Sequence, residues 1–169
     1  MRGLAAMANL VAARGTSPPK AHVDARGTLI IHGCRGNDRV ELVGNRGAQV
    51  AYTHFVNGRI VVHQQKFNGI RNVVFLAYDG NNTFINNTNL PSKALGGAGV
   101  DRFFGGSGAD VFYGLGGNDV LEGRAGSDRL YGGTGEDILR AGGGTEDAAG
   151  LVKHGLAGLR NRLIEESSV

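Results

Sequence analysis

The sequence predicts an all-β protein: a parallel β-roll, or β-solenoid, of nonapeptide repeats, with irregular β coils before it and a short helix after it. A nine-residue unit runs five times without a gap from Gly96 to Arg140. Glycine supplies 30 of the 169 residues, far above the usual share of ~7 %, without the three-residue period of collagen. Short β-branched runs between glycine or asparagine turns fill most of the chain before residue 96. Together these observations predict a fold of short stacked strands.

The chain divides into four segments, of which the first is residues 1–20. It holds a short alanine-rich run, Gly3–Ala13, and then Ser17-Pro18-Pro19. A disordered leader and a remnant signal segment are both compatible with this pattern.

Residues 21–95 are predicted to form irregular N-terminal coils of the same solenoid. Two stretches fit the repeat frame loosely: Gly33–Val40, with Asp38 at the acidic position, and Asp79–Phe84, with Asn82 there. Asn57-Gly58 separates two strand-like runs and predicts a hairpin. Strands bounded by turn residues are expected at Thr28–His32, Gln49–Val56, Arg59–His63 and Asn72–Ala77, with an intermediate strand within Asn87–Leu95.

Residues 96–144 form the regular repeat block, with the units GGAGVDRFF, GGSGADVFY, GLGGNDVLE, GRAGSDRLY and GGTGEDILR. Glycine opens each unit and returns at position four, aspartate follows at position six, and a large apolar residue stands at position eight. Six residues can make a turn and three a short strand, so the apolar residues should stack into a narrow core. They are Phe103, Phe112, Leu121, Leu130 and Leu139.

The nonapeptide resembles the RTX, or hemolysin-type calcium-binding, repeat. The resemblance is strong over 96–140 and weaker back to about Ala21. It implies Ca²⁺ as cofactor and a site between two turns 18 residues apart, which pairs Asp101 with Asp119, Asp110 with Asp128, and Asp119 with Asp137. Ca²⁺ takes six to eight oxygen ligands. The predicted metal-site residues are Asp101, Asp110, Asp119, Asp128, Asp137, Gly97, Gly99, Gly106, Gly108, Gly117, Gly126, Gly133 and Gly135.

Two units depart from the pattern at position two, where Leu115 and Arg124 replace glycine. If that position needs a positive φ, both residues strain their turns. We therefore expect the calcium sites that touch these two turns to be the least able to bind metal.

Residues 145–169 are predicted to be a C-terminal amphipathic segment. Leu151, Leu156, Leu159, Leu163 and Ile164 lie near helical spacing, although three glycines weaken a helix. Such a helix would cap the roll or serve as the uncleaved export signal that many relatives carry, and both interpretations stay open.

Charge is unevenly distributed, although the net charge is only +3. Residues 1–95 carry 11 Lys/Arg against 4 Asp/Glu, and residues 96–140 carry 4 against 7. The acidic block coincides with the predicted metal sites. The basic half suits solvated strand edges better than a nucleic-acid interface.

No motif of a catalytic centre is found. HExxH and GxSxG are absent, so the zinc-protease and lipase domains that accompany such repeats in other proteins are not indicated. The five histidines are expected in strands or at the surface, and Cys34 is expected to be a tolerated thiol in a turn. The protein is therefore predicted not to be an enzyme.

The favoured function is a calcium-binding extracellular repeat module that is stabilised when Ca²⁺ binds between stacked turns. A noncatalytic appendage of a secreted hydrolase or protease, and an adhesin or matrix protein that binds cell-surface polysaccharide, are the alternatives. A secreted location fits sites of weak affinity, because extracellular calcium modules work at ~10⁻⁴–10⁻³ M.

Overall fold

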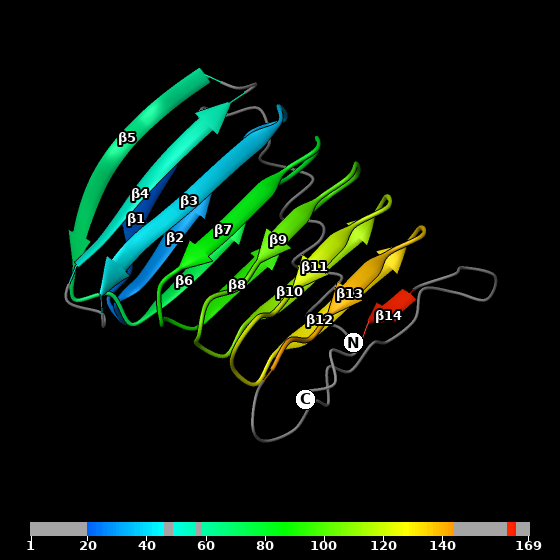
Figure 1. Ribbon diagram of the computed structural model, residues 1–169. Helices are drawn as coiled ribbons and strands as arrows, with labels where there is room; N and C mark the ends of the chain where they lie inside the picture. The colour runs from blue at the N-terminus through cyan, green and yellow to red at the C-terminus, as the bar shows by residue number, and fades with distance from the viewer. Residues whose placement is uncertain (1–19, 46–48, 57–58, 144–161, 165–169) are drawn as a thin grey trace.

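The computed structural model describes residues 20–45, 49–56, 59–143 and 162–164, and within them the fold consists of strands without a helix. The strands form two facing sheets (Figure 1). In spatial order the first sheet holds β1 (Lys20–Val23), β2 (Thr28–His32), β6 (Asn72–Leu76), β8 (Ser92–Leu95), β10 (Val111–Gly116) and β12 (Arg129–Thr134). The second holds β14 (Arg162–Ile164), β13 (Ile138–Arg140), β11 (Val120–Glu122), β9 (Arg102–Phe104), β7 (Thr83–Asn87), β3 (Asp38–Asn45), β4 (Gln49–Val56) and β5 (Arg59–Asn68).

From β6 to β13 the chain alternates between the two sheets, and neighbouring strands of a sheet run parallel. Phe103 pairs with Leu121, and Leu121 pairs with Leu139, so one full coil takes 18 residues. The predicted all-β class and the parallel pairing are therefore confirmed. The short turns between strands lie in two rows, one along each side of the sheets (Figure 1).

The first coil differs because a hairpin is inserted in it. Asp38 contacts Asn82, 44 residues further on, instead of a residue one coil away. The added chain is largely β4 and β5, which pair antiparallel with each other and extend the second sheet beyond β3. β1 likewise pairs antiparallel with β2. Antiparallel strands thus cover the N-terminal edge of both sheets.

Most predicted strands are confirmed with small changes in their bounds. β2 and β4 have the expected residues, whereas β5 continues beyond His63 to Asn68 because it pairs with the whole of β4. β1 and β3 were not predicted. In β3 the buried Val40 and Leu42 alternate with more exposed neighbours. The sequence predicts a turn there instead, because Gly36-Asn37-Asp38 has the composition of a turn.

The prediction of a C-terminal helix is wrong at residues 162–164, which form strand β14 beside β13. Leu163 lies in register with Leu139, so the backbone there extends the second sheet, and the glycines before it disfavour a helix. The rest of the predicted C-terminal segment, the predicted leader up to residue 19 and the Asn57-Gly58 turn lie outside the described residues.

The core lies between the two sheets. Phe103, Phe112, Leu121, Leu130 and Leu139 are at most 1 % exposed, which confirms the inward direction predicted for position eight. Four phenylalanines from successive coils make contact in the middle of the stack, with ring centroids 5.5 to 6.4 Å apart: Phe75, Phe84, Phe103 and Phe112. This packing buries the one face that each coil cannot bury alone.

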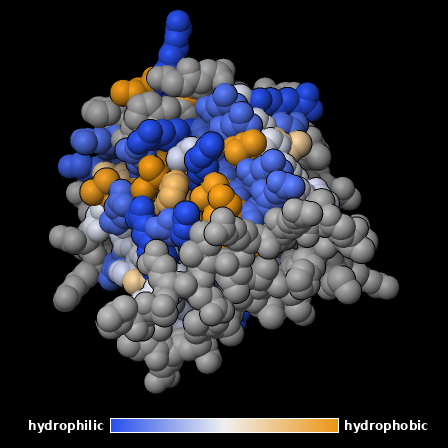
Figure 2. Space-filling model, turned by 45° about the vertical axis from the view of Figure 1, so that its right-hand side comes forward, coloured by the Kyte–Doolittle hydropathy of each residue, from blue (hydrophilic) through white to orange (hydrophobic). Residues whose placement is uncertain are grey.

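On the face drawn in Figure 2, apolar residues form small areas separated by polar side chains. Among the described residues, no helix is long and apolar enough to cross a membrane.

Candidate metal sites between stacked turns

The five repeat aspartates lie just before their strands and are almost completely buried, with at most 5 % of each residue exposed. Three of them, Asp101, Asp119 and Asp137, precede strands of the second sheet. Asp110 and Asp128 precede strands of the first sheet. Each aspartate therefore belongs to one of two rows of turns.

Within each row, a backbone N–H of one coil donates to a carboxylate of the next. Asp101 N donates to Asp119 Oδ1 at 2.8 Å, and Asp119 N donates to Asp137 Oδ1 at 2.9 Å. In the other row, Asp110 N donates to Asp128 Oδ1 at 2.8 Å. The structure thus brings together all three pairs that the sequence predicted.

The irregular coils continue both rows with uncharged residues. The N–H of Asn82 donates to Asp101 Oδ1 at 2.8 Å. In the other row, the N–H and the hydroxyl of Ser92 donate to Asp110 Oδ1, at 2.8 and 2.6 Å. Asn82 had been placed in the repeat frame by sequence, whereas Ser92 had not, because its turn contains Pro91 and differs in length.

The second carboxylate oxygen separates the repeats into two groups. Asp101 Oδ2 accepts from the N–H of Gly97 at 3.1 Å, and Asp110 Oδ2 accepts from that of Gly106 at 2.9 Å. By contrast, Oδ2 of Asp119 and Oδ2 of Asp128 are buried without a hydrogen-bond partner. A buried acceptor without a donor is costly in free energy, and a cation would remove that cost.

The two unpartnered oxygens occur in the units that lack glycine at position two. Leu115 and Arg124 stand there with φ angles of 79° and 68°, which confirms the predicted strain. In these units the residue four before the aspartate does not donate its N–H to Oδ2. The two turns that depart from the repeat pattern therefore hold the two carboxylate oxygens without a hydrogen-bond partner. The departure does not by itself argue against a calcium site there.

A backbone carbonyl lies close to each unpartnered oxygen, where the first glycine of the unit has no side chain. A Cβ on Gly114 would lie 2.1 Å from Asp119 Oδ2 and 2.6 Å from the carbonyl oxygen of Gly132, one coil further on. At Gly123 the corresponding distances are 2.2 Å to Asp128 Oδ2 and 2.6 Å to the carbonyl oxygen of Ala141. Acceptor oxygens from two successive turns thus converge at each position.

The predicted glycines serve the close stacking of the turns. A Cβ on any of them would lie less than 3.0 Å from a backbone atom of the preceding coil, and five of them have positive φ angles. The five are Gly99, Gly117, Gly126, Gly133 and Gly135, and the other three are Gly97, Gly106 and Gly108. No other residue type permits this approach of turn to turn.

Burial disfavours ionised carboxylates in both rows. It raises the pKa of Asp119 to about 8, and the neighbouring charges of Asp101 and Asp137 contribute to the rise. Burial also raises the pKa values of Asp101 and Asp128 to about 6 and shifts those of Asp110 and Asp137 upward. A cation bound between the stacked turns would favour the ionised carboxylates and lower these pKa values.

The donor set fits a hard cation better than a transition metal. Among the described residues, no group of three or more His, Cys, Asp or Glu side chains is arranged to hold a metal ion. A site here must combine carboxylate oxygens with backbone carbonyls, the mixture that Ca²⁺ accepts.

Sequence reasoning missed one buried polar residue beside the first turn. His54 was expected in a strand or at the surface, and it does lie in β4, but its side chain is fully buried and its Nε2 lies 2.7 Å from Asp38 Oδ1. No spacing along the chain signals this contact, because it arises from the pairing of β3 with β4, in which Val40 is the partner of His54.

The comparisons with known proteins agree with the repeat geometry. The model of the RTX calcium-binding nonapeptide repeat (4 copies) matches residues 95–129 and 113–145. No curated protein and no solved structure matches the chain. Residues 95–145 therefore match the RTX calcium-binding nonapeptide repeat, and this repeat implies Ca²⁺ as the cofactor.

Proposed function

We propose that the protein is a noncatalytic, extracellular calcium-binding module, and that Ca²⁺ stabilises the coils of residues 96–143 as a β-roll. The proposal is supported most directly by the buried, unpartnered Oδ2 atoms of Asp119 and Asp128. Each lies beside a carbonyl oxygen of the next coil, so a bound cation would link successive turns.

In this proposal the aspartates supply the charged ligands. Asp119 is flanked in its row by Asp101 and Asp137, so it would contribute to two sites. The glycines at positions two and four allow the turns to stack closely enough for carbonyl oxygens to face the ion. When bound, Ca²⁺ would supply positive charge between carboxylates that otherwise repel each other.

An extracellular setting follows from the expected weakness of such sites. Each ion would be shared by two separate turns, and weak sites fill only at the ~10⁻⁴–10⁻³ M calcium typical of extracellular modules. Submicromolar affinity at every site in isothermal titration would remove this reason. The polysaccharide-binding and hydrolase-appendage alternatives stay predictions.

Thermal unfolding of the purified chain tests the proposal. Millimolar CaCl₂ should raise Tm relative to EDTA, because a ligand that binds only the folded form stabilises it by mass action. MgCl₂ at the same concentration is the control, since Mg²⁺ demands a smaller octahedral site. An unchanged Tm and an unchanged far-ultraviolet circular dichroism spectrum with calcium would contradict the proposal.

A further inference from the structure

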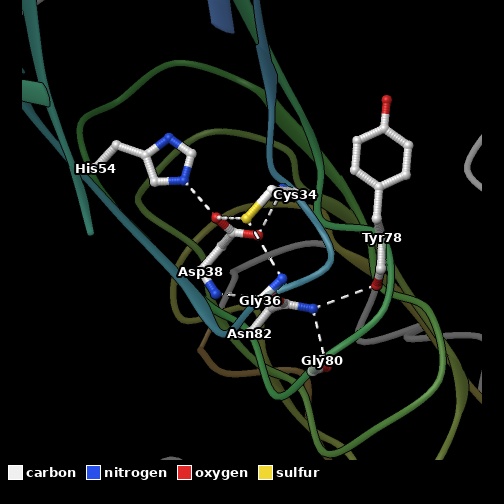
Figure 3. Close-up of polar contacts among 7 residues, drawn as sticks. All are labelled: Cys34, Gly36, Asp38, His54, Tyr78, Gly80 and Asn82. Carbon is white, nitrogen blue, oxygen red and sulfur yellow. Dashed lines mark hydrogen bonds and ion pairs between the residues drawn. The ribbon is translucent and has the colours of Figure 1, made fainter. Parts of the chain in front are cut away.

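The first coil contains the same turn as the calcium repeats, but protein donors occupy its carboxylate. Asp38 is 1 % exposed. Its Oδ2 accepts from the N–H of Cys34 at 2.8 Å, and its Oδ1 lies 2.7 Å from Nε2 of His54 and 3.5 Å from the Cys34 thiol sulfur (Figure 3). The imidazole satisfies this buried oxygen in the tautomer in which Nε2 carries the proton. Neither oxygen of Asp38 resembles the unpartnered Oδ2 of Asp119.

His54 stands where an earlier coil would have placed a backbone N–H. In the repeats, Oδ1 of each aspartate accepts from the residue one coil before it, as Asp119 accepts from Asp101. Among the described residues no coil of this kind precedes Asp38. The antiparallel strand β4 lies beside β3 instead, and it carries the imidazole to the vacant donor position. His54 therefore ends the row of carboxylates.

The second coil also uses donors of its own in place of a cation. The N–H of Asp38 donates to Asn82 Oδ1 at 3.0 Å, and Asn82 Nδ2 donates to the carbonyl oxygens of Tyr78 and Gly80, at 3.3 and 3.0 Å. These contacts are drawn in Figure 3. These carbonyls belong to the turn that precedes Asn82. The side-chain amide therefore donates hydrogen bonds to oxygens of the kind that would face a metal in a calcium turn.

The other row of turns follows the same rule. Ser92 holds the place of an aspartate, and its hydroxyl donates to Asp110 Oδ1 at 2.6 Å. Asn86 Nδ2 donates to the carbonyl oxygen of Leu90 at 3.0 Å, and Asn86 Oδ1 accepts from the N–H and the hydroxyl of Thr88. These three side chains are buried and carry no charge.

We infer that the coils of residues 20–95, here called the leading coils, fold without metal, with His54 as the cap that closes their row. They then present a stable, preformed end on which the coils of residues 96–143, only marginally stable without metal, are held when calcium binds. The inference rests on the proposed function for the second step only, because the contacts that hold the leading coils involve no metal.

Hydrogen–deuterium exchange of the whole chain, in EDTA and in millimolar CaCl₂, tests both steps separately. Peptides from 28–45 and 72–87 should be strongly protected in both conditions, whereas peptides from 96–140 should be weakly protected in EDTA and gain strong protection with calcium. Equal, rapid exchange of both groups of peptides in EDTA would overturn the inference. Failure of calcium to protect 96–140 would instead contradict the proposed function.

Variants of His54 test its role as the cap. His54→Leu keeps the size and burial but leaves Asp38 Oδ1 with only the Cys34 thiol, 3.5 Å away, as a weak donor. Exchange of 28–45 and 72–87 in EDTA should therefore rise roughly tenfold, toward the lower end of the cost of an orphaned buried acceptor. His54→Gln restores an N–H donor and should recover much of the protection. His22→Leu, at an exposed histidine of β1, is the matched control. Unchanged exchange of these peptides in His54→Leu would refute the cap.

Discussion

Replacing Asp119 by asparagine should stabilise the metal-free protein and weaken its response to calcium. Oδ1 of the new side chain can still accept from the N–H of Asp101, which donates to Asp119 at 2.8 Å. The unpartnered Oδ2 becomes an NH₂ donor instead. The chain already shows this arrangement at Asn82, whose Nδ2 donates to the carbonyls of the residues four and two before it. For the new amide at position 119, the corresponding carbonyls would be those of Leu115 and Gly117.

The magnitude follows from the cost of a buried acceptor without a partner, about 1–3 kcal/mol. Without calcium, Asp119→Asn should therefore raise the free energy of unfolding by about that amount, which corresponds to roughly 2–8 °C of Tm per kcal/mol for domains of this size range. With calcium the gain should disappear or reverse, because the variant lacks a charged ligand.

Thermal and urea unfolding in EDTA and in millimolar CaCl₂ measure both effects. Asp119→Ala is the control: it removes the acceptor for Asp101 N–H as well, so it should destabilise the protein in both conditions. A destabilised Asp119→Asn protein in EDTA, together with a Tm shift on calcium addition equal to that of the wild type, would refute the reasoning.

Three further predictions concern pH, the core and backbone strain. Burial raises the pKa of Asp119 to about 8 and those of Asp101 and Asp128 to about 6, so the metal-free folded state holds protons that the unfolded state releases. Its free energy of unfolding should therefore fall as the pH rises from about 4 to 8, whereas stabilisation by calcium should grow. Urea unfolding that shows metal-free stability rising across this range would contradict the raised pKa values. Leu121→Ala should lower the free energy of unfolding in urea by about 2–5 kcal/mol, because Leu121 is fully buried. Val120→Ala, at a partly exposed neighbour, should lower it much less. Equal losses would argue against the inward direction of position eight. Leu115→Gly should stabilise the metal-free protein by about 1 kcal/mol, because a left-handed φ of 79° strains a residue with a Cβ. Tyr113→Gly in the same strand, β10, should instead destabilise it. A loss of stability in Leu115→Gly would show that the leucine side chain outweighs the strain.

The repeat block was predictable from the sequence because one physical requirement recurs in every unit. The nine-residue phase sets which side chain faces the core, and it correctly placed Phe103 and Leu121 inside. The same phase correctly predicted that Asp101 and Asp119 stack one coil apart. Strict periodicity turns local spacing into three-dimensional contact.

The irregular half was harder because its contacts depend on long-range pairing. The contact of His54 with Asp38 exists only because β4 folds back on β3, and no spacing along the chain encodes it. Ser92 escaped notice because its turn has lost the repeat frame while its backbone keeps the register with Val73. At Arg162–Ile164 the sequence favours a helix although the structure has a strand, since the apolar residues fit helical spacing as well as strand pairing.

The location of bound calcium tests the central claim most directly. Crystals of the calcium-loaded protein, measured at a wavelength where calcium scatters anomalously, should show anomalous difference peaks between stacked turns of residues 96–143. The account predicts peaks beside Asp119 Oδ2 and Asp128 Oδ2, close to Gly114 and Gly123, and none beside Asp38. Peaks confined to other parts of the molecule, or a peak at Asp38 with none at Asp119 and Asp128, would contradict it.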